Sequence, residues 1–352
     1  MTPTTPLSGD RVDPGALLPG DWLSAHIYYA YDRTPLLTRC VGPLIARLRE
    51  EELISGHFFV RHWLEGSHLR LRLRPEDGRA GEVRQLLEAE VTGFLDREPS
   101  VYDPGRDLSQ EQYRERFLLE FSAEQWARRY GEDGRMPQHE YNTLGYFEYA
   151  PEVGRYGGAR GLELAERHAE HSSDLAFDVL AAENVHVRSV LLGLGSQVML
   201  ATAYAFMGDH QRTAGFFGEY LASWEGMFGT EYERYERAYQ QMAESLRARV
   251  RTIHGAVAEG GAGAGPAFVP GWASRCADLR KDLADAADRG LLDSPETGDP
   301  VPGSSGASWE RALSYLARSH LHMTNNRLGI SVSAENYLSF VLRRAITDCF
   351  LT

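Results

Sequence analysis

The chain has 352 residues, of which 43% are hydrophobic and 25% are charged, and its formal net charge is -13 at pH 7. This balance is typical of a soluble globular protein, and the length suits one large domain or two small ones. The acidic balance excludes a general nucleic-acid binder, which would carry a basic footprint. Any basic site must therefore be local, and we expect no direct nucleic-acid partner.

The cysteine count and the N-terminus favour a cytoplasmic protein. An odd number of cysteines without CxxC spacing fits a reducing compartment and offers no framework for a metal: Cys40, Cys276 and Cys349. The first residues, MTPTTPLSGDRVDPG, lack the pattern of a signal peptide. No stretch is predicted to span a membrane, and the most apolar run, residues 190–207, contains polar residues and predicts a buried helix.

The first half of the chain predicts an antiparallel sheet module after a flexible tail at residues 1–20. Hydrophobic spacing predicts, in order, a strand, a helix, a strand pair, a helix, a charged loop region with helical pieces, and a strand: residues 21–31, 35–52, 57–74, 79–97, 98–138 and 140–149. This order matches a ferredoxin-like module over residues 21–160.

The second half, residues 161–352, predicts a largely helical part. Amphipathic spacing places helices at about 161–183, 184–207, 209–226, 230–258, 272–290, 308–327 and 333–347. A Gly-rich connection at 255–270 and a loop at 292–308 interrupt them. We therefore expect an α+β fold in which the helical part packs on the sheet module to form one functional unit.

The stretch His57–Arg74, HFFVRHWLEGSHLRLRLR, predicts a hairpin with a two-residue turn at Glu65-Gly66. That register places Arg61 opposite Arg70. Alternation then separates a leucine face from a basic face, whose members are Arg61, His68, Arg70, Arg72 and Arg74. Like charges directly opposite one another destabilise a sheet, so the crowding indicates a bound anion; a solvated strand face is the alternative.

Two further stretches could contribute to a site. In YAPEVGRYGG, residues 149–158, Glu152 and Arg155 lie three apart, and Tyr156 precedes a Gly pair that permits a sharp turn. A local ion pair with a structural tyrosine is the alternative. In the helix that contains HLHMTNNR, the 3.6-residue period places His320 on an apolar stripe and His322 on a polar face, with Asn326 one turn later. His320 is therefore predicted to be packed, and His322 is either a proton-transfer group or a surface histidine.

The motifs WLSAHIYY, HFFVRHWLEGSHLRLRLR, YAPEVGRYGG and HMTNNRLGIS follow one another in this order. In them the chain resembles the elimination domain of class I lantibiotic dehydratases and the related stand-alone thiopeptide-type bacteriocin biosynthesis proteins. The resemblance covers nearly the whole chain after the tail. His62 departs from it, since the family usually has Tyr there, and residues 98–138 and 255–305 match poorly.

The resemblance implies an enzyme that removes glutamate from glutamylated Ser or Thr side chains of a precursor peptide to leave dehydroalanine or dehydrobutyrine. It implies a separate glutamyl-tRNA-dependent glutamylating enzyme as partner, and no metal, ATP or redox cofactor. Carried over by motif, the catalytic residues are Arg70, Arg72, Glu152, Arg155 and His322. Candidate substrate-binding residues beside them are Arg61, His68, Tyr156 and Asn326.

The chemistry fits these residue types. β-Elimination needs a base for the Cα proton, for which histidine is suited near neutral pH, and cations for the enolate-like charge and the departing carboxylate. Arg70, Arg72, Arg155 and His322 are expected to converge on one cavity. Two alternatives stay open: a pyridine synthase, which performs a formal [4+2] cycloaddition of two dehydroalanines with loss of the leader, and a non-catalytic peptide-binding partner.

Overall fold

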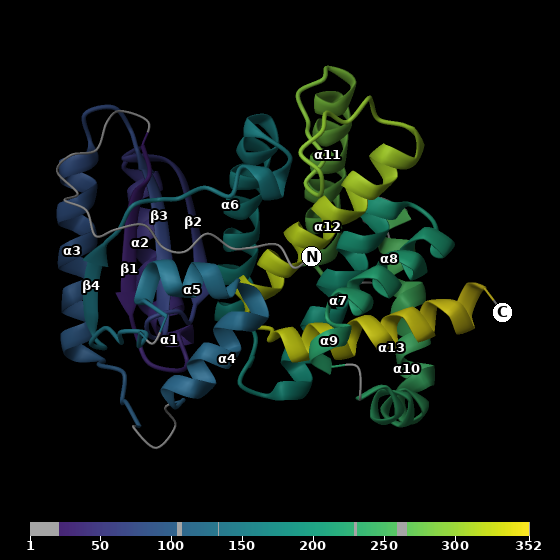
Figure 1. The fold of residues 1–352 in the computed structure, drawn as a ribbon, viewed down its shortest axis with the longest axis horizontal. Helices are drawn as coiled ribbons and strands as arrows, with labels where there is room; N and C mark the ends of the chain where they lie inside the picture. Colours follow the sequence, from purple (N-terminus) through teal and green to yellow (C-terminus); the bar gives the residue numbers. More distant parts are fainter. Residues whose placement is uncertain (1–20, 104–107, 133, 229–230, 259–265, 352) are drawn as a thin grey trace. The chain divides into compact units, whose positions relative to one another are not determined.

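The computed structural model describes residues 21–103, 108–132, 134–228, 231–258 and 266–351. The expected tail, residues 1–20, lies outside them, as does part of the expected connection at 255–270. The chain divides into two compact units, one ending at Glu152 and the other beginning at Val153 (Figure 1). Each unit is described by itself.

The first unit is built on a four-stranded antiparallel sheet with the order β2-β3-β1-β4. Its strands are β1 (Leu23–Tyr28), β2 (Ile54–His62), β3 (His68–Pro75) and β4 (Thr143–Tyr146). Helices α1 (Thr34–Leu36) and α2 (Gly42–Glu50), joined by the π turn η2 (Leu37–Val41), connect β1 to β2. Helix α3 (Ala80–Arg97) is the first of the helices that lie between β3 and β4. The predicted ferredoxin-like α+β module is confirmed.

One face of this sheet is covered by helices, which appear beside the strands in Figure 1. The leucines of β3, Leu69, Leu71 and Leu73, are fully buried on it. Tyr146 of β4 lies on the same face, because it pairs with Ala25, which in turn pairs with Leu71, and its hydroxyl donates to Glu88 of α3 at 3.2 Å. Burial of each leucine contributes about 1.5–3 kcal/mol.

The predicted hairpin register is wrong by one residue. β2 pairs with β3 so that Arg61 faces Leu69 and Val60 faces Arg70. The loop contains five residues, Trp63 to Ser67, and not two. Because paired residues share a face, Arg61 lies on the leucine face, and Phe58 and Val60 lie on the basic face.

The longer loop has a packing cause. Leu64 leaves the ladder and is buried in a cluster with the helices α4 (Gln110–Glu120) and α5 (Ala123–Tyr130), whose members are Leu64, Phe117, Phe121, Trp126 and Met136. Glu65 adopts a positive φ of 62° and accepts hydrogen bonds from Arg129 Nε at 2.6 Å and from the Tyr130 hydroxyl at 2.8 Å. These hydrogen bonds to α5 stabilise the five-residue conformation of the loop.

The second unit is helical, as predicted. It begins with the short 3-10 helix η4 (Gly154–Tyr156). The helices that follow are α6 (Ala159–Ala182), α7 (Arg188–Met207), α8 (His210–Ser223), α9 (Glu225–Phe228), α10 (Tyr232–Ala258), α11 (Phe268–Asp288), α12 (Gly306–Leu328) and α13 (Val332–Phe350). α13 packs between α8 and α10, and α7 packs against α8, α10, α11, α12 and α13.

Helix α7 corrects one expectation. We expected no stretch that could span a membrane, but α7 is the one described helix that is long and apolar enough to do so, judged by length and composition alone. However, 67% of its most apolar window is buried within the protein. This burial agrees with the prediction of a core helix.

Candidate active site

The face of the first sheet opposite the leucines carries buried cations and imidazoles. Arg70 and Arg72 are 7% and 6% exposed. On this face they pair with Val60 and Phe58 of β2 and with His26 and Ser24 of β1. We call the cluster of Arg70, Arg72, His26, His62 and His68 the arginine face.

Within the arginine face the hydrogen bonds of the two guanidinium groups are incomplete. Arg70 donates from Nε to His68 Nε2 at 3.2 Å. Arg72 donates from Nη1 to the Leu71 carbonyl at 3.3 Å, and its Nη2 lies 3.5 Å from His26 Nε2. Arg70 Nη2 and Arg72 Nε are buried and meet no hydrogen-bond partner among the described residues. Buried N–H groups of this kind are costly unless a ligand or water satisfies them.

The arginine face keeps its positive charge at neutral pH. Burial lowers the pKa of Arg70 to about 10. Burial, together with the neighbouring Arg70, lowers the pKa of Arg72 to about 9. Burial, followed by the nearby arginines, also lowers the pKa of all three imidazoles, those of His26, His62 and His68, so these rings stay neutral. The site therefore holds two arginine charges among neutral rings.

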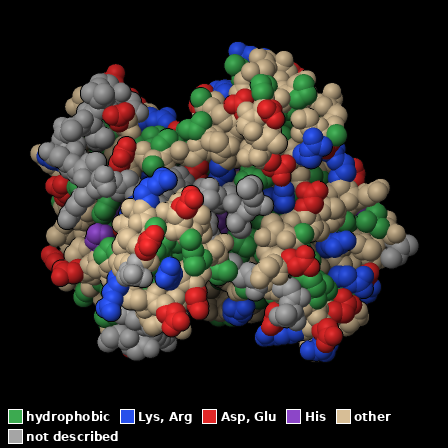
Figure 2. Space-filling view, viewed as in Figure 1, with side chains coloured by type: hydrophobic (Ala, Val, Ile, Leu, Met, Phe, Trp, Pro, Cys, Tyr) green, Lys and Arg blue, Asp and Glu red, His purple; other side chains and the backbone are tan. Residues whose placement is uncertain are grey.

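Aromatic side chains border the arginine face. Phe147 stacks on His26 with ring centroids 4.2 Å apart, and the Arg72 guanidinium lies 5.4 Å from the centre of the Tyr149 ring. Arg74 lies over Trp22 at 4.1 Å. In contrast, the basic side chains visible on the surface in Figure 2 are interspersed with acidic ones.

Of two further predicted site residues in this unit, one lies near the arginine face and the other does not. Glu152 belongs to the arginine face electrostatically, because its carboxylate raises the pKa of Arg70 against the larger effect of burial. Arg61 does not belong to it, because the shifted register turns it to the leucine face, near Asp32. Its assignment to the basic face was wrong.

The second part of the YAPEVGRYGG stretch, which belongs to the helical unit, forms the sharp turn that the Gly pair predicts. Gly157 and Gly158 adopt φ values of 77° and 94°. The turn also lies against Asp293, whose backbone oxygen would be 2.7 Å from a Cβ at position 157. Arg155, on η4, is buried, with 8% exposure. Its positive charge reaches two neighbours: it adds to the burial that lowers the pKa of His320, and it opposes in part the burial that raises the pKa of Tyr220.

His322 lies on α12 and is hydrogen-bonded to an acid on α13. Its Nδ1 is 3.0 Å from Glu335 Oε2, and the Tyr220 hydroxyl donates to the same oxygen. Burial and the adjacent Glu335 raise the pKa of Tyr220 well above its usual range, so Tyr220 stays protonated. With Nδ1–H donating to the carboxylate, the His322 lone pair is on Nε2. The side chain of His322 is 24% exposed, whereas that of Glu335 is 1% exposed.

Glu335 and Tyr220 were missed as site residues at the sequence level. One signal was available for Glu335: it shares the buried stripe of α13 with Leu338 and Leu342, where an unpartnered carboxylate would be very costly. Tyr220 carries no such signal, because an aromatic residue on an apolar helix face is ordinary packing. A sharp turn brings Glu335 to His322: Gly329 has a φ of 84°, and Ile330 N–H donates to the Asn325 carbonyl at 2.9 Å.

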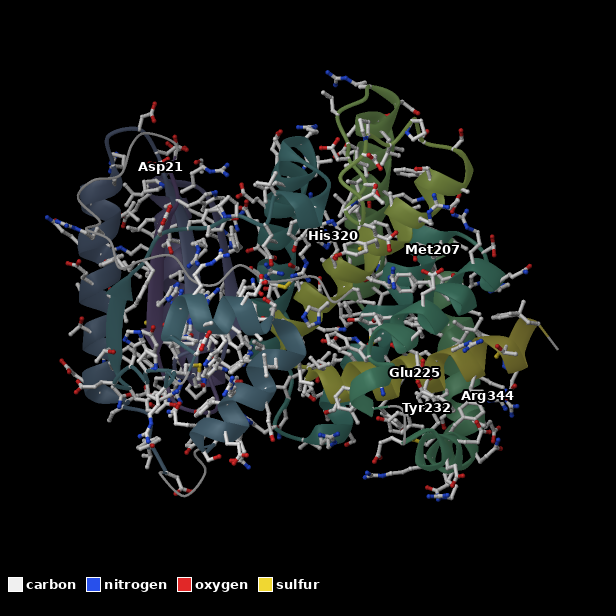
Figure 3. All side chains as sticks on the ribbon, viewed as in Figure 1. Asp21, Met207, Glu225, Tyr232, His320 and Arg344 are labelled. Carbon is white, nitrogen blue, oxygen red and sulfur yellow. The ribbon has the colours of Figure 1, made fainter. Side chains whose placement is uncertain are left out.

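The two histidines of α12 separate as the helical period predicts. His320 is 2% exposed and packs against the rings of Tyr156, His168 and Phe206. Figure 3 shows its place among the helices of the second unit. Asn326 is half-buried one turn beyond His322. His320 is thus a packed residue, whereas the side chain of His322 is partly exposed on another face of the helix.

We expect His320 to make stability depend on pH. Burial, followed by the charges of Arg155 and Arg327, lowers its pKa to about 3. The unfolded chain takes up this proton below about pH 6.5, so the free energy of unfolding should fall by about 1.4 kcal/mol per pH unit as pH drops from there toward the folded pKa. His320→Gln should make the free energy of unfolding less dependent on pH, by the contribution of one bound proton. Urea unfolding between pH 7 and 4 measures this.

The control for this prediction is His186→Gln, since His186 is exposed on the surface. This variant should leave the pH slope of the wild type unchanged. If both variants kept the wild-type slope, His320 would not be the buried neutral group described above.

The predicted cavity that combines Arg70 and Arg72 with Arg155 and His322 stays a prediction, because these residues belong to the two separate units. Among the residues that the structure describes, no group of three or more His, Cys, Asp or Glu side chains could hold a metal ion.

Comparison with known proteins identifies the family. The model of the family described as "Lantibiotic biosynthesis dehydratase C-term" matches residues 22–346, and the chain belongs to this family. It is thus a member of a family of peptide-modifying enzymes of lantibiotic biosynthesis, which act on precursor peptides. A search of curated proteins found no match.

Solved structures show the same fold. TbtD, a pyridine synthase from thiomuracin biosynthesis, is 20% identical with a TM-score of 0.70, and the match covers 93% of this chain and 98% of that one. TsrL is 18% identical with a TM-score of 0.63, covering 94% and 96%. MibB, a tRNA-dependent lantibiotic dehydratase from Microbispora sp. 107891, is 19% identical with a TM-score of 0.54, covering 94% of this chain and 28% of that one.

Proposed function

We propose that this protein is a lyase that eliminates glutamate from glutamylated Ser and Thr side chains of a precursor peptide. The observation that carries the proposal is the pair of buried arginines, Arg70 and Arg72, of which Arg70 Nη2 and Arg72 Nε meet no hydrogen-bond partner among the described residues. Two cations held with open hydrogen-bond donors suit a substrate that carries and releases carboxylates.

The reaction begins at the Cα proton of the esterified residue. His322 Nε2 takes this proton, and the hydrogen bond from Nδ1 to Glu335 stabilises the imidazolium that forms. The electron pair of the C–H bond forms the Cα=Cβ double bond. The Cβ–O bond breaks, and its electrons leave with the α-carboxylate of glutamate, the carboxyl group that glutamyl-tRNA carries as an ester. The products are dehydroalanine or dehydrobutyrine and free glutamate.

In this proposal the arginines stabilise two different negative charges. Arg70 and Arg72 bind the carboxylates of the glutamyl group, while Arg155 stabilises the enolate-like charge on the neighbouring carbonyl. Glu152 orients the guanidinium groups, and Tyr156 and Asn326 contact the peptide. The proposal requires both units to act on one ester. It involves a separate glutamyl-tRNA-dependent enzyme that supplies the ester, and a cytoplasmic setting.

A pyridine synthase is the second candidate. It is favoured by the match to TbtD, which covers nearly the full length of both chains. However, the two dehydroalanines that react in a formal [4+2] cycloaddition are neutral and release water, so this reaction leaves the buried arginine pair without an anion. The third candidate is a non-catalytic peptide-binding partner. The hydrogen bond between His322 and Glu335 argues against it, because this arrangement suits proton transfer.

Product analysis separates the three candidates. The purified protein is incubated with a glutamylated precursor peptide and, separately, with the same peptide carrying two dehydroalanines. We expect loss of glutamate from the first peptide and no change in the second, by mass spectrometry. Loss of the leader with macrocycle formation from the second would establish the pyridine synthase instead. No mass change in either would support the binding partner.

A further inference from the structure

The imidazole of His68 lies between a backbone carbonyl and the guanidinium of Arg70. Its Nδ1 is 2.8 Å from the Gly66 carbonyl oxygen, and its Nε2 is 3.2 Å from Arg70 Nε. A carbonyl oxygen can only accept, and an arginine Nε–H can only donate. Both partners therefore require the same tautomer, with the proton on Nδ1 and the lone pair on Nε2.

The ring is held in this position on both sides. His26 stacks on His68 with centroids 4.8 Å apart, and the rings of Tyr28 and His62 lie at 4.9 Å and 5.3 Å. His68 is 1% exposed, and burial lowers its pKa well below the usual range. A neutral ring with a fixed acceptor atom is the result.

We propose that His68 is a positioning residue for Arg70: it fixes the guanidinium through Nε as a neutral acceptor and leaves the charge and the outer N–H groups of Arg70 to an anionic substrate. This replaces the role in substrate binding expected from the sequence. It rests on the proposed function, because it concerns the same arginine face.

The same hairpin shows what a charged acceptor does. Glu65 accepts from Arg129 Nε at 2.6 Å, and this carboxylate raises the pKa of Arg129 against the effect of burial. The charge of Arg129 is thereby compensated within the protein. Arg70 has the opposite arrangement: its Nε is held by a neutral ring, and its Nη2 meets no partner among the described residues.

Three substitutions of His68 distinguish positioning from packing. His68→Gln places an amide oxygen near the position of Nε2 and can still accept from Arg70. His68→Asn reaches only the position of Nδ1 and cannot. His68→Glu supplies an acceptor that compensates the charge. We expect kcat for glutamate release to stay within about fivefold of wild type in His68→Gln. It should fall about 10- to 100-fold in His68→Asn, which loses the hydrogen bond to Arg70, and in His68→Glu, which compensates the charge that the substrate requires.

Nitrogen-15 NMR of the full chain gives a readout that does not depend on activity. We expect the wild-type His68 ring to show Nδ1 protonated and the Arg70 Nε–H to be protected from exchange in the wild type and His68→Gln, but not in His68→Asn. A wild-type ring protonated on Nε2, or equal kcat losses in the Gln and Asn variants that follow their thermal stability, would overturn the proposal. Should the NMR results hold while the wild type released no glutamate, the proposed function would fail and the positioning role would stand.

Discussion

Replacing His322 with alanine should slow glutamate release about 10²–10⁴-fold, the range expected for loss of a general base, while the fold stays intact. The side chain is partly exposed, and it contributes one hydrogen bond, to Glu335. The substitution also removes a ring contact with Trp224, but Glu335 keeps the hydrogen bond from the Tyr220 hydroxyl. Single-turnover kinetics on a glutamylated peptide, together with thermal unfolding of the same sample, measure both effects.

His320→Ala is the matched control, since His320 lies two residues away on the same helix but packs among aromatic rings. It should cost about 1–3 kcal/mol of stability and leave the chemical step near the wild-type rate at a temperature where the variant is folded. If both variants lost equal stability and kept equal activity, the assignment of His322 as the base would be wrong.

Arg72→Lys should lower the elimination rate of a glutamyl ester about 10- to 100-fold, since charged hydrogen bonds contribute about 1.5–3 kcal/mol. A compact ammonium cannot reproduce the planar fork of a guanidinium, and Arg72 is buried with its Nε–H unpartnered among the described residues. The same loss should appear in the wild type when the glutamyl ester is replaced by an acetyl ester, which lacks the carboxylate. Rates are compared on matched peptides.

The acetyl ester also supplies the internal test, because Arg72→Lys should slow it much less than the glutamyl ester. Arg79→Lys is the control variant: Arg79 is exposed and pairs with Glu82 at the start of α3. Equal rates for the two esters in the wild type would mean that the arginine face does not recognise glutamate, and would favour the cyclisation reaction.

Much of the fold could be predicted from the sequence because its determinants are local. The leucines and arginines of β3 alternate strictly, so the two faces of that strand follow from its own residues. The phase of His320 and His322 likewise follows from one helix. Both predictions are confirmed, since Leu69 and His320 are buried as expected and Arg70 lies on the opposite face from Leu69.

The predictions failed where distant residues decide the geometry. The hairpin register depends on Leu64, which joins a cluster with Phe117 and Trp126 more than fifty residues later. A pattern of short range cannot include this contact, and a shift of one residue moved Arg61 to the other face. Glu335 and Tyr220 were missed for the same reason, since they meet His322 only when α8, α12 and α13 pack together.

The most direct test of the central claim is the balance between two products. A peptide with one glutamylated serine, carbon-13-labelled in the glutamyl group, is incubated with the purified protein, and labelled glutamate and dehydroalanine are quantified together. The proposed elimination predicts one free glutamate for each dehydroalanine formed, at a rate that falls in His322→Ala. Release of glutamate with regeneration of serine would show ester hydrolysis, and the absence of free glutamate would show that the arginine face serves another reaction; either result would contradict the account.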